Sequence, residues 1–229
     1  MVALTFVTGV VDAVGYLGLD RVFTGNMTGN IVILGMGVAG ADDLPVLGPA
    51  IALACFTIAA WSAGLALRGR AGAGWNLRIT ALLTVGGLVL AGLAVSAALD
   101  PNPGTTGQIV MAMLTAAVMG QQAMVARTLA VPDMTTVVVT STLASLAGET
   151  WTRGWPGALV NRRVAAIVTI FLGAVVGAAL LAVHLAVPLA LSAVTTIAVV
   201  VVGHRRLYTP RSQGAPEADV RGRAVLGLR

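Results

Sequence analysis

Hydrophobic residues along this chain gather into long runs, and short polar stretches separate the runs. A helix that crosses a bilayer needs about 20 apolar residues, so run length distinguishes spanning helices from shorter elements. Four runs reach this length comfortably, two are slightly short but adequate, and two are too short to be secure spans. In that order they are Gly48–Leu67, Ile79–Leu99, Gln108–Ala126 and Val164–His184; Val2–Leu19 and Val187–Gly203; and Ile31–Ala41 and Met134–Gly148.

Arginines cluster at three places between and after these runs, and cytoplasmic loops are the expected location of such clusters. An even number of crossings must separate any two cytoplasmic loops. Six spans satisfy this condition, whereas eight would place three crossings between the first two clusters. We therefore predict an all-α, polytopic transmembrane bundle of about six spans with both termini in the cytoplasm, the two short runs being re-entrant or half-helical segments. The clusters are Arg68, Arg70 and Arg78; Arg153, Arg162 and Arg163; and Arg205, Arg206 and Arg211.

A weak internal repeat divides the predicted bundle into two parts. Asn26-Met-Thr falls on Asp133-Met-Thr at an offset of 107 residues (133 − 26). Three spans per half would make the second half inverted relative to the first, and inverted repeats with interrupted helices are a common transporter plan. Chance similarity within so apolar a sequence is the alternative interpretation. The predicted halves are residues 1–99 and 108–203.

Composition agrees with a membrane protein. Hydrophobic residues make up 57% of the chain and charged residues 10%, whereas soluble domains carry about 25% charged residues. We expect residues 1–203 to form a single transmembrane domain in the bacterial inner membrane and residues 204–229 to form a disordered cytoplasmic tail. The net charge of +5 comes from arginines in short loops and the tail, so no nucleic-acid partner is expected.

Asp12 lies within the first predicted span, where an isolated carboxylate is costly and usually functional. Such a group either becomes neutral or finds a partner, and Arg21 and Arg127 are the candidates. A contact with Arg21 would need a break in the helix near Gly15. One interpretation is a proton-coupling or substrate-orienting acid, and the other is a structural ion pair that locks the two halves together.

The stretch Thr24-Gly-Asn-Met-Thr-Gly-Asn30 is a polar turn punctuated by glycines, and it precedes the short run Ile31–Ala41. Thr28 or Asn30 is expected to cap the half-helix, and the free N–H groups there would suit a polar or anionic solute. Asn26, Thr28 and Asn30 are therefore candidate site residues. An ordinary helix cap after a loop is the alternative.

A second polar group lies in the second half. Gln121 and Gln122 interrupt an apolar span, and adjacent residues face different sides of a helix. One amide is expected to form a hydrogen bond between helices, while the other faces a cavity. A purely structural role, in which the amides only join neighbouring helices, is the alternative and the slightly favoured interpretation. Farther along, Asp133 and Thr136 are the candidates among a run of hydroxyl-bearing residues.

These motifs resemble the YoaK-type family of small bacterial integral membrane proteins. In the first half they are Asp12-Ala13, Arg21-Val22-Phe23 and Asn26–Asn30; in the second they are Gln121-Gln122-Ala123, Arg127, Thr135-Thr136 and Thr140-Ser141. The sequence departs from the family pattern at Gln122 and Ser141. The resemblance implies a polytopic, permease-like inner-membrane protein without an assigned substrate.

The leading functional hypothesis is a membrane transporter or channel-like permease for a small polar or anionic solute, with proton coupling through Asp12. The alternative is a non-transporting membrane protein, such as an assembly partner or sensor. An enzyme is not expected, because neither a nucleophile–base pair nor a metal-ligating cluster is evident, and no cofactor or metal is expected. The expected partners are the lipid bilayer and the solute, while the sequence leaves a homo-oligomer open.

Overall fold

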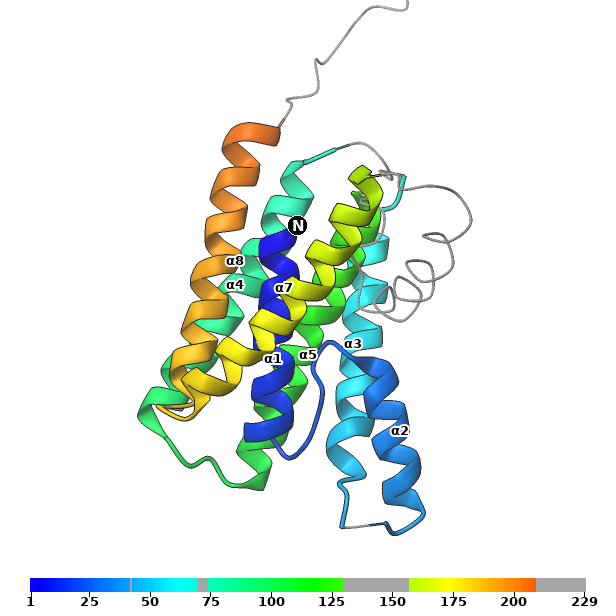
Figure 1. The fold of residues 1–229 in the computed structure, drawn as a ribbon, viewed down its shortest axis with the longest axis vertical. Helices are drawn as coiled ribbons and strands as arrows, with labels where there is room; N and C mark the ends of the chain where they lie inside the picture. Colours follow the sequence, from blue (N-terminus) through cyan, green and yellow to red (C-terminus); the bar gives the residue numbers. More distant parts are fainter. Residues whose placement is uncertain (42, 70–73, 130–156, 209–229) are drawn as a thin grey trace, which may run out of the picture.

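The computed structural model describes residues 1–41, 43–69, 74–129 and 157–208, with side chains described throughout except at residues 157–163. These residues form α-helices and no strand (Figure 1). The predicted all-α class is therefore confirmed. The helices are α1 (Val2–Gly18), α2 (Met27–Val38), α3 (Leu47–Ala66), α4 (Leu77–Leu99), α5 (Thr105–Thr128), α7 (Gly157–Leu181) and α8 (Ala186–Leu207).

All of these helices run roughly along the long axis of the bundle, and α2 is the shortest of them (Figure 1). Five of them, α3, α4, α5, α7 and α8, contain segments long and apolar enough to cross a membrane. Helix α1 has 17 residues and is about 26 Å long at about 1.5 Å per residue. It packs extensively against α7, so it lies within the bundle alongside the five longer helices.

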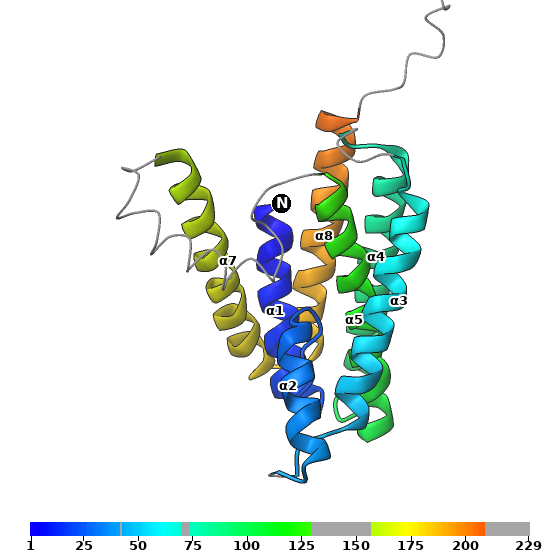
Figure 2. The ribbon, with the colours of Figure 1, turned by 90° about the vertical axis from the view of Figure 1, so that its right-hand side faces the viewer.

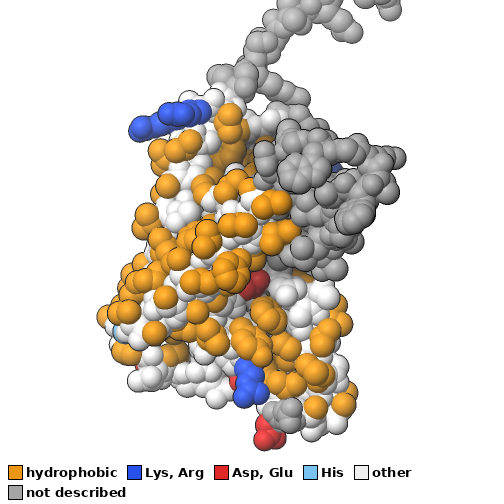
Figure 3. Space-filling model, in the orientation of Figure 1, with side chains coloured by type: hydrophobic (Ala, Val, Ile, Leu, Met, Phe, Trp, Pro, Cys, Tyr) orange, Lys and Arg blue, Asp and Glu red, His pale blue; other side chains and the backbone are white. Residues whose placement is uncertain are grey.

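The outer surface of the bundle is apolar. Apolar side chains cover most of the middle of the face in Figure 3, and basic side chains lie mainly near its ends. Large hydrophobic side chains such as Trp61, Leu88 and Phe171 are each at least 60% exposed. Exposed apolar surface of this extent is what a bilayer covers.

The two ends of the bundle differ in charge. The termini of α3, α4, α5 and α8 that carry arginine side chains lie at the same end, which is also the end where α1 begins (Figure 1). We call this the arginine end. Among the residues with described side chains, its arginines are Arg68, Arg78, Arg127, Arg205 and Arg206. The opposite end carries Asp20, Asp43 and Asp100 together with the single arginine Arg21 among the described residues, and we call it the acidic end.

The helix interfaces have the symmetry expected of two inverted halves. The most extensive interfaces are α1 with α7, α3 with α5, and α4 with α8. Suppose that α1, α3 and α4 of the first half correspond, in that order, to α5, α7 and α8 of the second half. The interface of α1 with α7 then has its counterpart in the interface of α5 with α3. The interface of α4 with α8 is its own counterpart, so it lies on the symmetry axis. Corresponding helices run in opposite directions along the bundle (Figures 1 and 2). This arrangement agrees with the predicted inverted repeat.

Glycines allow close approach at the two equivalent interfaces. A Cβ atom at Gly9 of α1 would meet the carbonyl oxygen of Ile170 in α7. A Cβ atom at Gly120 of α5 would likewise meet the carbonyl oxygen of Phe56 in α3. Small residues permit such backbone contact between membrane helices, so both interfaces depend on the absence of a side chain.

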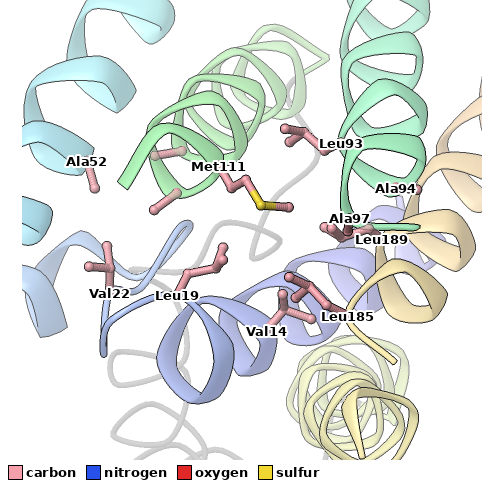
Figure 4. Close-up of a cluster of buried hydrophobic side chains, with 12 residues drawn as sticks. Val14, Leu19, Val22, Ala52, Leu93, Ala94, Ala97, Met111, Leu185 and Leu189 are labelled. Carbon is pink, nitrogen blue, oxygen red and sulfur yellow. The ribbon is translucent and has the colours of Figure 1, made fainter. Parts of the chain in front are cut away.

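A cluster of buried side chains near the acidic end joins most of the helices (Figure 4). Leu93 of α4, Met111 of α5 and Leu189 of α8 contribute to it. Leu19 and Val22, which follow α1, are fully buried in the same cluster. The segment after α1 is therefore anchored in the core rather than lying on the surface.

Helix α8 continues beyond the predicted boundary, since it ends at Leu207 and not at Gly203. His204 explains the extension: its ring stacks on Tyr208 with centroids 4.8 Å apart. Its Nδ1 atom lies 3.2 Å from the hydroxyl oxygen of Thr80 in α4. The rest of the predicted tail, residues 209–229, lies outside the described residues.

Candidate functional site

The chain between α1 and α2 reverses at the acidic end and returns into the bundle. The reversal takes place at Asp20 and Arg21, whose φ angles are 58° and 54°. The following residues then run back alongside α1 (Figure 1). Gly15 permits this close return, because a Cβ atom there would meet the carbonyl oxygen of Val22.

Helix α2 begins part-way along the bundle, at the depth of Asp12. Asp12 lies six residues before the end of α1 at Gly18, which corresponds to about 9 Å along the helix. From this depth α2 runs 12 residues back toward the acidic end (Figure 1). The predicted half-helical character of the run Ile31–Ala41 is therefore confirmed. The other short run, Met134–Gly148, lies outside the described residues.

Asp12 binds the irregular backbone that precedes α2. Its Oδ1 atom accepts hydrogen bonds from the N–H groups of Thr24, Gly25 and Asn26, with N···O distances of 2.9, 2.6 and 3.4 Å. The Thr24 hydroxyl lies 3.4 Å from the same oxygen. Non-helical backbone at membrane depth is tolerated only where its polar groups find partners within the protein. We call this set of bonds the Asp12 clasp.

Asn30 provides a second connection to the same segment. Its side chain is fully buried, and its Oδ1 accepts the N–H of Phe23 at 2.8 Å. Its Nδ2 donates to the carbonyl oxygen of Phe23 at 2.6 Å. The Phe23 ring stacks on Tyr16 of α1, with centroids 5.0 Å apart. Asn30 thus joins α2 to the returning segment, which the aromatic pair joins to α1.

The predicted helix cap was wrong. Asn26, not Thr28 or Asn30, caps α2, and its side chain accepts the N–H of Gly29 at 3.2 Å. Thr28 is exposed, and Asn30 is engaged with Phe23. Several N–H groups expected to bind an anionic solute are therefore already paired with Asp12 or Asn26.

The predicted arginine partners of Asp12 were also wrong. Among the described residues no ion pair involves Asp12. Arg21 is exposed at the reversal, and α1 continues past Gly15 without a break. Arg127 is exposed in the last turn of α5, at the arginine end. Three backbone N–H groups compensate the carboxylate instead, and they do so without burying a second charge.

Gln121 and Gln122 contact different helices, so the prediction that they face different sides of α5 is confirmed. The Nε2 atom of Gln121 donates to the carbonyl oxygen of Leu82 in α4. The Nε2 atom of Gln122 donates to the carbonyl oxygen of Leu4 in α1 at 3.1 Å. It also lies 3.5 Å from the hydroxyl oxygen of Thr8. Both amides therefore link α5 to helices of the first half.

The Oε1 atom of Gln122 is buried and has no hydrogen-bond partner among the described residues. The whole side chain is only 6% exposed. An unpaired buried acceptor costs about 1–3 kcal/mol, so its retention requires a reason. Thr8 and Asp12 are four residues apart and share one face of α1. We call Gln122, Thr8 and Asp12 the polar row.

The sequence predicts a role in the site for Gln121 but not for Gln122 or Thr8. Gln122 departs from the family pattern, so the resemblance gives no support for a role of this residue in the site. Thr8 carries no signal in the sequence, because only the packing of α1 against α5 brings its hydroxyl to Gln122. Asp133 and Thr136 lie outside the described residues and stay predictions.

The chain is similar to the UPF0700 transmembrane protein YoaK of Bacillus subtilis (strain 168). The two are 32% identical over 143 residues, which is 62% of this chain and 62% of the relative. No solved structure matches the chain. The model of a family described as "Protein of unknown function (DUF1275)" matches residues 1–202. The resemblance inferred from the polar motifs is confirmed, and the chain belongs to the DUF1275 family.

Proposed function

We propose that this protein is a transporter or channel-like permease for a small polar solute. The observation that carries the proposal is the polar contact where the two inverted halves meet. There Gln122 of α5 faces Leu4 and Thr8 of α1, and its Oε1 atom is left without a described partner. Inverted repeats with polar sites at their interface are the architecture of many secondary transporters.

The chemistry of the polar row favours a solute that donates hydrogen bonds. The Oε1 atom of Gln122 is an acceptor. The hydroxyl of Thr8 donates to the carbonyl oxygen of Leu4 at 3.1 Å and accepts from Nε2 of Gln122 at 3.5 Å, which leaves one of its two lone pairs for a further donor. The carboxylate of Asp12 adds negative charge one turn away. A solute with N–H or O–H groups fits this set better than an anion.

Proton coupling is assigned to Asp12. Hydrogen bonds to a charged acceptor are roughly twice as strong as bonds to a neutral one, so proton binding weakens the Asp12 clasp. The returning segment and α2 would then separate from α1 more readily. In this mechanism the half-helix α2 moves when Asp12 binds a proton.

The orientation follows from the arginines. We assign the arginine end to the cytoplasm of a bacterial plasma membrane, because cytoplasmic loops carry the excess of basic residues. Both ends of the described chain then lie on the cytoplasmic side, and the acidic end faces outward. A solute entering from outside would first meet the half-helix α2.

The proposal is tested in proteoliposomes that contain a pH-sensitive dye. Neutral amino acids, urea-like amides, polyols and carboxylates are supplied one class at a time. A class with N–H or O–H donors should produce solute-dependent proton flux, and Asp12→Asn should abolish it. Solute uptake without protons is followed in parallel by the light scattering of the vesicles. If folded protein gives neither proton flux nor uptake with any class, transport is contradicted.

One observation favours the second candidate, a non-transporting assembly partner or sensor. The bonds of Asp12, Asn26 and Asn30 all go to groups within the chain. Such bonds suffice to stabilise a re-entrant segment without any solute. The flux measurement separates the two candidates.

A further inference from the structure

A groove remote from the Asp12 clasp runs along the surface formed by α4 and α5. Its volume is about 540 Å³, which lies within the range of about 300–1,000 Å³ typical of ligand sites. Leu93 and Met111, which are only 6% and 5% exposed, line it from the core. Gly92, Ser96 and Val110 line its open side and are exposed. Its walls are therefore mostly apolar and face the bilayer.

The length of the groove corresponds to one leaflet. Its lining residues on α4 extend from Val89 to Asp100, a separation of 11 residues (100 − 89). This is about 16 Å at about 1.5 Å per residue. The hydrocarbon core of a bilayer is about 30 Å thick, so the groove runs from the end of the bundle to about the middle of the membrane. An acyl chain of one leaflet covers the same depth.

The end of the groove at the membrane surface is polar and negatively charged. Asp100 follows α4 and is exposed, with the N–H of Asn102 3.3 Å from its Oδ1 atom. The hydroxyl-bearing residues Ser96 and Thr106 also line the groove, and no basic residue does. A carboxylate beside two hydroxyls complements an ammonium group, which donates up to three hydrogen bonds.

The neighbouring start of α5 suits the other charge of a zwitterionic head group. Helix α5 begins at Thr105, and its N-cap residue Gly104 provides no side-chain hydrogen bond. The first N–H groups of a helix without such a cap favour a phosphate. The groove thus combines an apolar channel, an acidic residue and uncapped N–H groups.

We infer that this groove binds phosphatidylethanolamine from the surrounding bilayer. One acyl chain lies along Gly92 and Leu93, the ammonium group binds Asp100, and the phosphate lies at the start of α5. Phosphatidylcholine fits less well because its quaternary ammonium cannot donate hydrogen bonds. Phosphatidylglycerol has no cation and carries a net negative charge that Asp100 repels.

The test uses the full chain, purified in detergent and mixed with one of these three lipids carrying identical acyl chains. Native mass spectrometry then measures the lipid retained per protein. Phosphatidylethanolamine should be retained several-fold more than either other lipid. Asp100→Asn should reduce its retention to the level of phosphatidylcholine, because an amide cannot attract the ammonium charge.

Gly92→Leu tests the apolar part of the groove. A Cβ atom at Gly92 would have no atom within 4 Å, so the leucine side chain has room to occupy the groove. Retention of phosphatidylethanolamine should fall several-fold. Gly35→Leu is the matched control, because Gly35 of α2 is equally open and does not line the groove.

Equal retention of the three lipids by the unaltered protein would overturn the inference and indicate an unselective lipid layer only. Full retention by folded Gly92→Leu would overturn the assignment of the acyl chain to this groove. If Gly92→Leu does not fold, Asp100→Asn decides, and a lipid preference unchanged in that variant would refute the inference.

Discussion

Replacing Asp12 with alanine should destabilise the protein by releasing the returning segment from α1. The substitution removes the common acceptor of three N–H groups, of which those of Thr24 and Gly25 lie at 2.9 and 2.6 Å. A hydrogen bond to a charged group contributes about 1.5–3 kcal/mol. The two short bonds together therefore predict a loss of about 3–6 kcal/mol in the free energy of unfolding.

Asp12→Asn should have a smaller effect. Its amide oxygen still accepts hydrogen bonds, but each bond to a neutral acceptor contributes only about 0.5–1.5 kcal/mol. Two such bonds retain about 1–3 of the 3–6 kcal/mol, so we expect a loss of about 2–3 kcal/mol. Asp12→Ala should therefore lower the free energy of unfolding more than Asp12→Asn does. This difference separates the effect of losing the acceptor from the effect of losing the charge alone.

The free energy is measured by reversible unfolding in mixed micelles of dodecylmaltoside and SDS. A local measurement accompanies it: Thr24→Cys, in a Cys55→Ser background, is exposed to a water-soluble maleimide. Thr24 is fully buried, so the cysteine should react slowly when Asp12 is present. It should react many-fold faster in Asp12→Ala.

Thr28→Ala is the matched control, because it removes an exposed side chain from the start of α2. It should change the free energy of unfolding by less than about 0.5 kcal/mol, as surface substitutions usually do. The reasoning is refuted if Asp12→Ala costs no more than Thr28→Ala and leaves the Thr24→Cys labelling rate unchanged.

Three further predictions concern packing, the polar row and topology. Gly9→Ala should cost about 1–3 kcal/mol, measured by the same unfolding assay, because its Cβ would meet a backbone carbonyl oxygen of α7; Gly92→Ala, with open space, should cost far less. Gln122→Leu should change the free energy of unfolding by less than about 1 kcal/mol, since an unpaired acceptor and its donor leave together, and solute-dependent flux should nevertheless be lost; retained flux would remove Gln122 from the pathway. A reporter fused after Arg211 should be cytoplasmic and one inserted at Asn102 periplasmic, and a periplasmic Arg211 fusion would contradict the assigned orientation.

Much of the architecture was predictable from the sequence because the membrane imposes simple rules. A bilayer of nearly constant thickness makes the length of an apolar run a direct measure of its ability to span. The run Ile31–Ala41 was recognised as half-helical because it is too short to cross, and α2 confirms it. The positive-inside rule favoured six spans over eight, because it requires the arginine clusters to lie on one side of the membrane. The arginine-bearing ends of α3, α4, α5 and α8 do lie together.

The partners of individual polar residues were not predictable in the same way. Reasoning from charge alone paired Asp12 with an arginine, because opposite charges are the usual solution for a buried acid. The structure instead pairs it with the N–H groups of residues 24–26. This pairing could not be predicted from the sequence. Backbone N–H groups are present at almost every position, so no residue type marks the ones that Asp12 binds.

The sequence by itself thus determined the membrane class, the helical segments, the half-helix and the family, all of which depend on hydrophobicity and local motifs. Only the tertiary structure decided which groups meet. The return of the chain after Gly15 brings backbone to Asp12, and the crossing of α1 with α5 brings Gln122 to Thr8. The physical reason is that hydrogen bonds act over about 3 Å, so they depend on packing between helices, whereas hydrophobic run length is a property of each segment alone.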